Sequence, residues 1–313
     1  MFEKVQEDPG CLGRFRKAND MERRINFADV IIMAVVIVIS FISLVPIVNT
    51  IMMSFSDKTS AAVGKVYFWP VNFTVTPYVR MLEDTRFFSA FRVSVIRVLL
   101  GTVFNVLLSV HMAFPLSKSK RQFPLRNVYA WFIVFTMLFN GGIVPNFLLV
   151  KGLGLMDTIW ALVLPGAVNV FNTIILMNFY KGIPSSLEES AMVDGAKPFT
   201  ILWRIYAPLA KASIATITLF SAVNHWNAFF DGLIYMNSPM KVPLQTYIQS
   251  LTVVLNSAEL QNMTPEQIIR RLEVSNLTFN AAKVMVSMIP IIVVYPFLQK
   301  YFVAGIVMGA VKE

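Results

Sequence analysis

The sequence is organised around one polar, turn-rich stretch between two long apolar runs, which reads Glu188-Glu189-Ser190-Ala191-Met192-Val193-Asp194-Gly195. Ser185 and Ser186 each precede a glutamate by three residues, which is the spacing of a capping box at a helix start. Gly195 is the residue type that most often ends a helix, because it tolerates a left-handed backbone. Pro198 suits the first turn of a following helix. The stretch therefore predicts a short helix, a tight bend and a second helix that re-enters the apolar region.

The composition of the whole chain is that of a membrane protein. Of 313 residues, 56% are hydrophobic and only 14% are charged, whereas an ordinary soluble domain has about 25% charged residues. The net charge of +9 could indicate a nucleic-acid partner. However, the basic residues lie in short clusters between apolar runs, without interleaved aromatic residues, and this pattern excludes nucleic acid.

Six apolar runs are each long enough to cross about 30 Å of hydrocarbon. They cover residues 30–53, 89–116, 128–150, 157–180, 212–236 and 282–302. The predicted fold class is therefore all-α, a polytopic membrane protein with one six-helix domain over 30–302. The remaining segments are an N-terminal segment (1–29), outer loops (54–88 and 237–281), an inner loop (181–211) and a tail (303–313).

The distribution of Lys and Arg predicts the orientation. With the N-terminus inside, the inner segments carry sixteen of these residues and the outer segments carry eight. The positive-inside rule therefore places both termini and the loop 181–211 in the cytoplasm.

No catalytic or metal-binding residues are predicted. The sequence contains no G-x-x-x-x-G-K-[ST] phosphate loop and no arrangement of residues that suits acyl transfer. Its one cysteine, Cys11, has no metal ligands near it in sequence, and the two histidines are far apart.

Polar residues inside the apolar runs mark a candidate path for a solute. Those that share helical faces are Asn169, Asn172 and Thr173 in the fourth run and Asn224, Asn227 and Asp231 in the fifth, and Asn140 lies in the third. Amides at the membrane centre need hydrogen-bonding partners. A water-filled passage for a hydroxyl-rich solute and hydrogen bonds between helices both remain open. We expect Asp231 to be solvated and Arg97 to extend toward the membrane surface.

The organising stretch resembles the EAA loop of bacterial ABC importer permeases, in which E-x-A-x-x-x-G is followed after nine residues by I-x-x-P. Ser190 and Ala207 depart from the family's usual residues but remain small or apolar. In that family the short helix is the coupling helix, which sits in a groove of a cytoplasmic ATPase subunit. The resemblance thus implies that the coupling residues are Glu188, Glu189, Ala191, Met192, Asp194, Gly195, Ile205 and Pro208.

Residues 30–313 are similar to carbohydrate importer permeases of the MalG type, and more narrowly to their LplC-like branch. The supporting stretches include Gly154-Leu155-Met156-Asp157-Thr158, His225-Trp226-Asn227 and Gln299-Lys300-Tyr301-Phe302-Val303-Ala304-Gly305. The resemblance implies a type I importer in a bacterial cytoplasmic membrane, with a second homologous permease as heterodimer partner, two ATPase subunits and an external solute-binding protein. ATP and Mg²⁺ would bind to the ATPase subunits, and no cofactor is implied for this chain. The implied cargo is a sugar or oligosaccharide, such as a fragment of alginate or pectin.

Two alternatives remain open. One is a self-sufficient secondary transporter or channel, although the apolar runs carry almost no acidic residues for ion coupling. The other is an ABC permease for a solute other than a sugar, since the EAA loop indicates coupling and says nothing about cargo.

Overall fold

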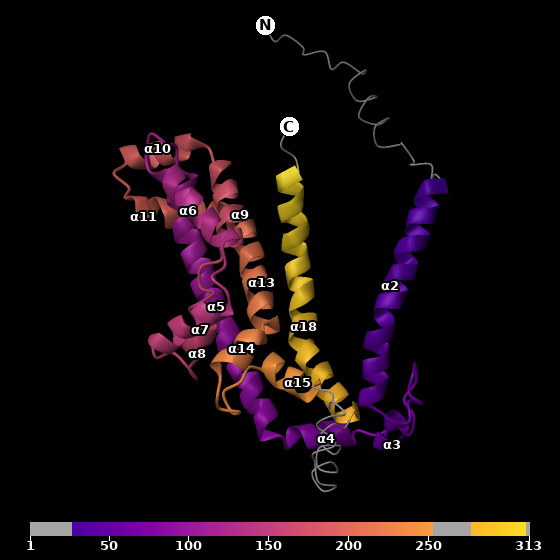
Figure 1. The fold of residues 1–313 in the computed structure, drawn as a ribbon. Coiled ribbons are helices and arrows are strands. Elements are labelled where there is room, and N and C mark those ends of the chain that lie inside the picture. The colour runs from indigo at the N-terminus through magenta and orange to yellow at the C-terminus, as the bar shows by residue number, and fades with distance from the viewer. Residues whose placement is uncertain (1–26, 253–276, 311–313) are drawn as a thin grey trace. The chain divides into compact units, whose positions relative to one another are not determined.

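The computed structural model describes residues 27–252 and 277–310, and all regular structure within them is helical. Most of the predicted N-terminal segment, the centre of the predicted outer loop 237–281 and the last three residues lie outside the described residues. The chain forms two compact units, Met1–Thr50 and Ile51–Glu313. Figure 1 labels the helices of both.

The apolar helix α2 spans Phe27–Ser54. Its residues up to Thr50 are the described part of the first unit, and its last four residues belong to the second unit. Within Asp29–Ser54, an 18-residue window has a mean hydropathy of 3.1, and the segment is long enough to cross a membrane. Pro46 lies within the helix, and its carbonyl accepts a hydrogen bond of 2.8 Å from the Thr50 hydroxyl.

The second unit is built on the long helix α5 (Thr85–Ser117). It packs against α13 (Lys211–Asn227) and α9 (Val170–Lys181), and α13 packs in turn against α18 (Leu277–Ala310). Since an α-helix rises 1.5 Å per residue, α5 is about 50 Å long. Separate apolar clusters form at its two ends, one around Phe114 and one around Phe87. The helix α5 therefore connects two distant sites.

Smaller helices surround the two ends of α5 (Figure 1). Near its start lie α3 (Lys58–Ala62), α4 (Thr76–Leu82) and α15 (Leu244–Thr252). At its other end lie α10 (Ser185–Val193), α11 (Pro198–Ile201), the π-helix η1 (Leu202–Tyr206) and α12 (Ala207–Leu209). The segment Pro198–Leu209 meets α13 at a bend of 85°.

Three of the predicted spans are interrupted. The third consists of α6 (Arg126–Leu138) and α7 (Ile143–Gly152), which meet at 110°. The fourth consists of α8 (Ile159–Val163) and α9, and the fifth of α13 and α14 (Phe230–Tyr235). In the third, the chain turns at Gly142, whose φ of +89° favours glycine.

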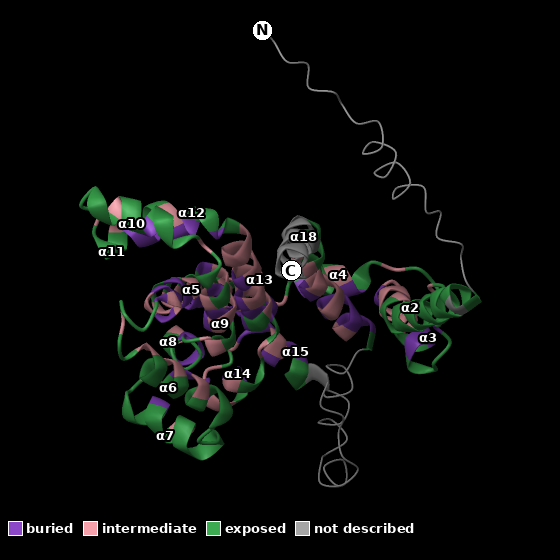
Figure 2. Cartoon of the chain, turned by 90° about the horizontal axis from the view of Figure 1, so that it is seen from above, coloured by how far each residue is buried: buried purple, intermediate pink, exposed green. Residues whose placement is uncertain are grey.

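Among the described residues, three helices are long and apolar enough to cross a membrane, or five if each of two bent pairs counts as one span. Most of α6 and α7 is coloured as exposed in Figure 2. The exposed residues of these helices include the large apolar Trp131, Phe132, Phe135, Leu148 and Leu149. Such surfaces suit lipid or another membrane helix rather than water. The count of six spans remains a prediction.

Candidate functional site

The predicted bend after the short helix is present at Gly195, whose φ is +79°. Its N–H donates to the carbonyl of Met192 at 3.0 Å, and the N–H of Ala196 donates to the carbonyl of Ala191 at 2.9 Å. Together these bonds form a Schellman motif, the helix ending that requires a left-handed residue. Pro198 opens α11, also as predicted. The chain therefore leaves α10 in a defined direction.

Glu188 points into the protein and not back toward the start of α10. Its buried Oε2 accepts hydrogen bonds from Lys118 Nζ and from the Tyr206 hydroxyl, both at 2.7 Å. The start of α10 has no side-chain cap, so the capping boxes predicted from Ser185 and Ser186 are wrong. The physical reason is that a charged hydrogen bond in a buried site is stronger than a bond to an exposed backbone N–H.

We call Lys118, Glu188 and Tyr206 the buried clamp. Lys118 ends α5, Glu188 lies in α10 and Tyr206 ends η1, so the clamp joins three elements at one point. The Lys118 ammonium also lies 3.8 Å from the centre of the Phe114 ring and 4.1 Å from that of Tyr206. These aromatic faces stabilise the cation where water is excluded. Burial lowers the pKa of Lys118 below its ordinary value, and the bond and charge of Glu188 oppose that shift.

Most residues of α10 other than Glu188 are exposed. Glu189, Met192 and Asp194 are all exposed, and Val193 has 88% of its surface accessible. Ala191 is half-buried against the core. Among the predicted coupling residues before the bend, the side chains available to a docking partner are therefore Glu189, Met192 and Asp194, whereas Glu188 holds the helix from within.

The two remaining coupling residues lie beyond the bend. Ile205 is in η1 and packs against the apolar cluster around Phe114. Pro208 lies in α12, two residues after the end of η1, and is exposed. A proline lacks the N–H that an α-helical turn needs, which favours a wider turn just before it. The π-helix brings Tyr206 to Glu188 and links the predicted docking helix to α13.

The candidate path residues of the fourth span bond within the protein. The Asn169 side chain accepts from the N–H of Asn172 at 3.0 Å and so caps α9. Asn172 is buried and its Nδ2 donates to Ser221 Oγ at 3.0 Å, which joins α9 to α13. The Thr173 hydroxyl donates to the carbonyl of Asn169 at 3.0 Å. These contacts favour hydrogen bonding between helices over a solute path at this site.

Asn224 and Asn227 are exposed on α13 and stay candidates for a path. Asn140 is exposed in the break between α6 and α7, where its Oδ1 accepts from the N–H of Gly142 at 2.9 Å. The helix α13 ends at Asn227, so Asp231 belongs to α14 and does not continue the same helical face. The predicted grouping of Asp231 with the two asparagines is therefore wrong.

The prediction that Asp231 is solvated and that Arg97 extends to the membrane surface is also wrong. Arg97 is buried, and its Nη1 donates to Asp231 Oδ1 at 3.1 Å and to the carbonyl of Ala228 at 3.0 Å. Its Nη2 forms an ion pair with Asp231 Oδ2. Burying an unpaired arginine costs free energy, which would favour its extension toward water. Pairing with a carboxylate offsets this cost and lets Arg97 remain buried. The pair also satisfies a carbonyl freed where α13 ends.

Asn105 forms a second buried polar centre, which sequence reasoning missed. Its Nδ2 donates to the carbonyls of Gly166 and Ala167 at 2.8 Å, and its Oδ1 lies 3.2 Å from His225 Nε2. The two carbonyls lie in the break between α8 and α9, so Asn105 supplies the donors that this break requires. A single asparagine in an apolar run carries no local signal of that role.

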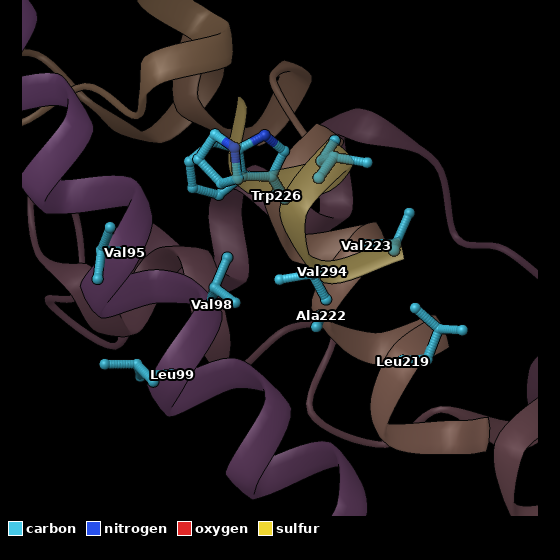
Figure 3. A pocket seen from close by; sticks show the side chains of 10 residues that line it. Val95, Val98, Leu99, Leu219, Ala222, Val223, Trp226 and Val294 are labelled. Atoms are coloured by element: carbon cyan, nitrogen blue, oxygen red, sulfur yellow. The ribbon is translucent and has the colours of Figure 1, made fainter. Parts of the chain in front are cut away.

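Two cavities formed by described residues of the second unit differ in character. One is a groove of about 190 Å³ between α5, α13 and α18, with only apolar residues around it; side chains such as Val98, Trp226 and Val294 line it (Figure 3). Trp226 packs edge-on against Phe91 with ring centres 5.9 Å apart. The other cavity, of about 570 Å³, lies among α4, α14, α15 and α18 and has charged residues in its wall.

Comparison with known proteins places these features in a family. Residues 87–308 match the model of the "Binding-protein-dependent transport system inner membrane component" family. Protein LplC of Bacillus subtilis is 38% identical over 277 residues, which cover 87% of this chain and 90% of the relative. The polygalacturonan/rhamnogalacturonan transport system permease protein YtcP of the same organism is 36% identical and covers 91% of this chain and 98% of its own length.

Two solved structures are similar. A bacterial ABC transporter involved in the import of the acidic polysaccharide alginate has a chain that is 33% identical, with a TM-score of 0.79, covering 90% of this chain and 98% of that one. A bacterial alginate ABC transporter in complex with an alginate pentasaccharide-bound periplasmic protein has a chain that is 15% identical, with a TM-score of 0.53, and shares the fold. These matches confirm the predicted resemblance, the permease architecture and a transport subunit instead of an enzyme.

Proposed function

This chain belongs to the family of binding-protein-dependent transport system inner membrane components, and from that premise we propose that it imports oligosaccharides, including polyuronate fragments. The cargo is inferred from relatives whose names state transport of polygalacturonan and of alginate. The observation that carries the coupling role is the arrangement of α10. The buried clamp fixes Glu188, while Glu189, Met192 and Val193 are exposed.

The proposed assembly contains a second homologous permease, two cytoplasmic ATPase subunits and an external solute-binding protein. ATP and Mg²⁺ would bind to the ATPase subunits, and both termini of this chain would lie in the cytoplasm. Support for this orientation comes from the excess of Lys and Arg in the inner segments. The exposed side of α10 would then face the ATPase subunits.

In this proposal α10 transmits the movement of the ATPase subunits to the membrane helices. A displacement of α10 would move Glu188, and the ion pair with Lys118 would carry that displacement to the end of α5. Since α5 is about 50 Å long, the same helix would carry it to the outer side. Alternating access would follow as the bundle opens outward and is then reset by hydrolysis.

Crosslinking from α10 tests the proposal. A Val193→Cys variant in a Cys11→Ser background gives one reactive thiol on the exposed side of α10. We expect a short bifunctional reagent to link this thiol to an ATP-hydrolysing subunit in native membrane vesicles. Thr59→Cys, placed in the outer loop, should give no such product. Recovery of no ATPase from the Val193→Cys variant, together with solute flux through the purified chain alone, would instead indicate a self-sufficient channel.

A further inference from the structure

The larger cavity lies at the end of α5 that is farthest from α10. Its wall contains residues of α4, the start of α5, α14, α15 and α18, and it encloses about 570 Å³. Asp84 caps the start of α5 at this cavity, whereas Lys118 ends the same helix at the buried clamp. If α10 is cytoplasmic, this cavity opens toward the outer side, from which an imported solute arrives.

One buried cation of the cavity is already neutralised. Lys283 is 1% exposed, and its Nζ donates to Asp84 Oδ2 at 2.6 Å. The Tyr247 hydroxyl donates to the same oxygen at 2.7 Å and also contacts Lys283 Nζ. Burial would raise the pKa of Asp84, but these bonds and the charge of Lys283 outweigh it and lower the pKa below its ordinary value. Lys283 and Asp84 thus form an ion pair of no net charge.

Two arginines of the cavity have no such partner. Arg80 and Arg86 are exposed, and within the described ranges neither lies at ion-pair distance from a carboxylate. The Arg80 guanidinium lies over the Phe279 ring, 5.2 Å from its centre, which restricts its orientation. The cavity wall therefore has two positive charges in excess. Leu233 and Met236 add apolar surface beside them.

We propose that this cavity binds the carboxylate groups of an acidic oligosaccharide through Arg80 and Arg86. The inference rests on the proposed import function and adds a binding site that selects acidic over neutral oligosaccharides. A guanidinium matches a carboxylate with two parallel hydrogen bonds, and two guanidiniums suit successive uronate units. The apolar side chains can contact the faces of the sugar rings. A neutral oligosaccharide of the same length would gain the apolar contacts without the charged bonds.

A thiol reporter in the cavity tests the proposal directly. Ser250 lines the cavity and is exposed, so Ser250→Cys in the Cys11→Ser background provides a single reactive thiol. The rate of its reaction with uncharged N-ethylmaleimide is measured in the assembled importer without the solute-binding protein. The two probes are trigalacturonate and its fully methyl-esterified form, which has the same backbone without charge.

We expect trigalacturonate to slow the reaction with a half-effect concentration about tenfold below that of the ester, because charged bidentate bonds form only with the acid. Arg80→Gln with Arg86→Gln should raise the half-effect concentration of trigalacturonate about tenfold and leave that of the ester unchanged. Arg92→Gln is the matched control, since Arg92 is an exposed arginine of α5 outside the cavity wall. That control should leave both values unchanged.

Equal protection by the two saccharides, or no protection by trigalacturonate, would overturn the inference. So would an equal effect of Arg92→Gln, which would indicate a general charge effect. If trigalacturonate fails to protect while a loaded binding protein still stimulates ATP hydrolysis, the proposed function stands and the cavity proposal fails. If protection occurs but no loaded binding protein stimulates hydrolysis, the proposed function fails instead.

Discussion

At the scale of single residues, two lysines are buried with one carboxylate each, at opposite ends of α5. Lys118 pairs with Glu188, and Lys283 pairs with Asp84. In both cases a tyrosine hydroxyl donates to the same carboxylate oxygen and an aromatic ring faces the ammonium. Buried pairs of this kind are strongly destabilised when one partner is removed, since the remaining charge stays buried.

We predict that Lys118→Met destabilises the protein and uncouples ATP hydrolysis from transport. The variant leaves Glu188 buried without a cation, which costs about 3 kcal/mol or more. Thermal unfolding in detergent and solute-stimulated ATP hydrolysis in proteoliposomes measure the two effects. Lys120→Met, an exposed neighbour, should change neither. Adding Glu188→Gln to Lys118→Met should restore much of the stability, and a double variant as unstable as the single one would contradict the buried clamp.

Asp84 gives the second prediction, which concerns pH. Its pKa in the folded protein is lowered below the ordinary 3.8, so the carboxylate contributes stability above about pH 4 that is lost as pH falls through the folded pKa. The thermal midpoint of the wild type should therefore be flat from pH 7 to 5 and should fall below pH 4. In Asp84→Asn the midpoint should be lower at pH 7 and should lose this acid dependence. Glu83→Gln is the control, because Glu83 is an exposed neighbouring carboxylate. If the thermal midpoint of Asp84→Asn still falls below pH 4 as in the wild type, groups other than Asp84 cause the acid destabilisation.

At the scale of elements, the sequence predicted those helices whose signals are local. The long apolar runs, the bend at Gly195 and the start of α11 at Pro198 follow from residues inside the elements themselves. The end of α13 at Asn227 has no such local signal, because the two residues that follow, Ala228 and Phe229, are neither proline nor glycine. Their carbonyls accept from Arg97 and Thr246, and Arg97 is 131 residues away in sequence. A break held by distant donors cannot be predicted from local patterns.

The difference between local signals and long-range contacts also explains which parts of the candidate site could be predicted from the sequence. The spacing of Glu189, Ala191 and Gly195 predicts that α10 is the docking helix, because that pattern is contiguous in sequence. The role of Glu188 was assigned wrongly to a cap, since its partner Lys118 is 70 residues away. Asn105, which bonds the break between α8 and α9, was missed for the same reason. Local sequence patterns therefore do not predict the long-range hydrogen bonds of buried polar residues.

We predict that Gly195→Val abolishes coupling while the protein still inserts into the membrane. A Cβ at Gly195 has open space around it, so the effect comes from the φ of +79° alone. A β-branched residue in this conformation costs roughly 1–2 kcal/mol, and the chain can relieve it by changing the direction in which it leaves α10. Binding-protein-stimulated ATP hydrolysis and solute uptake are measured in proteoliposomes at matched protein levels.

The control for this prediction is Gly195→Asn, because asparagine tolerates the left-handed conformation. It should keep most of the uptake. If Gly195→Val keeps wild-type uptake and stimulation, the direction of α10 does not matter for coupling.

At the scale of the whole molecule, the second unit has different chemistry at the two ends of α5. One end has an exposed helix with acidic and apolar side chains, and the other has a cavity with excess positive charge. The buried clamp and the Lys283–Asp84 pair hold neighbouring elements to the two ends of the same helix. A helix about 50 Å long exceeds the hydrocarbon thickness of about 30 Å, so α5 is long enough for its two ends to reach opposite sides of a bilayer.

The final prediction concerns the orientation of these two ends. The count of Lys and Arg places α10 inside, so a thiol at Val193 should react with a membrane-impermeant maleimide only in inverted vesicles, and a thiol at Ser250 only in right-side-out vesicles or intact spheroplasts. Both thiols are introduced singly in the Cys11→Ser background, and permeabilised membranes give the full labelling of each. Labelling of both thiols from the same side would contradict a membrane-crossing α5. The reverse pattern would place α10 away from the compartment that holds ATP, and the exposed side of α10 could then not be the ATPase contact.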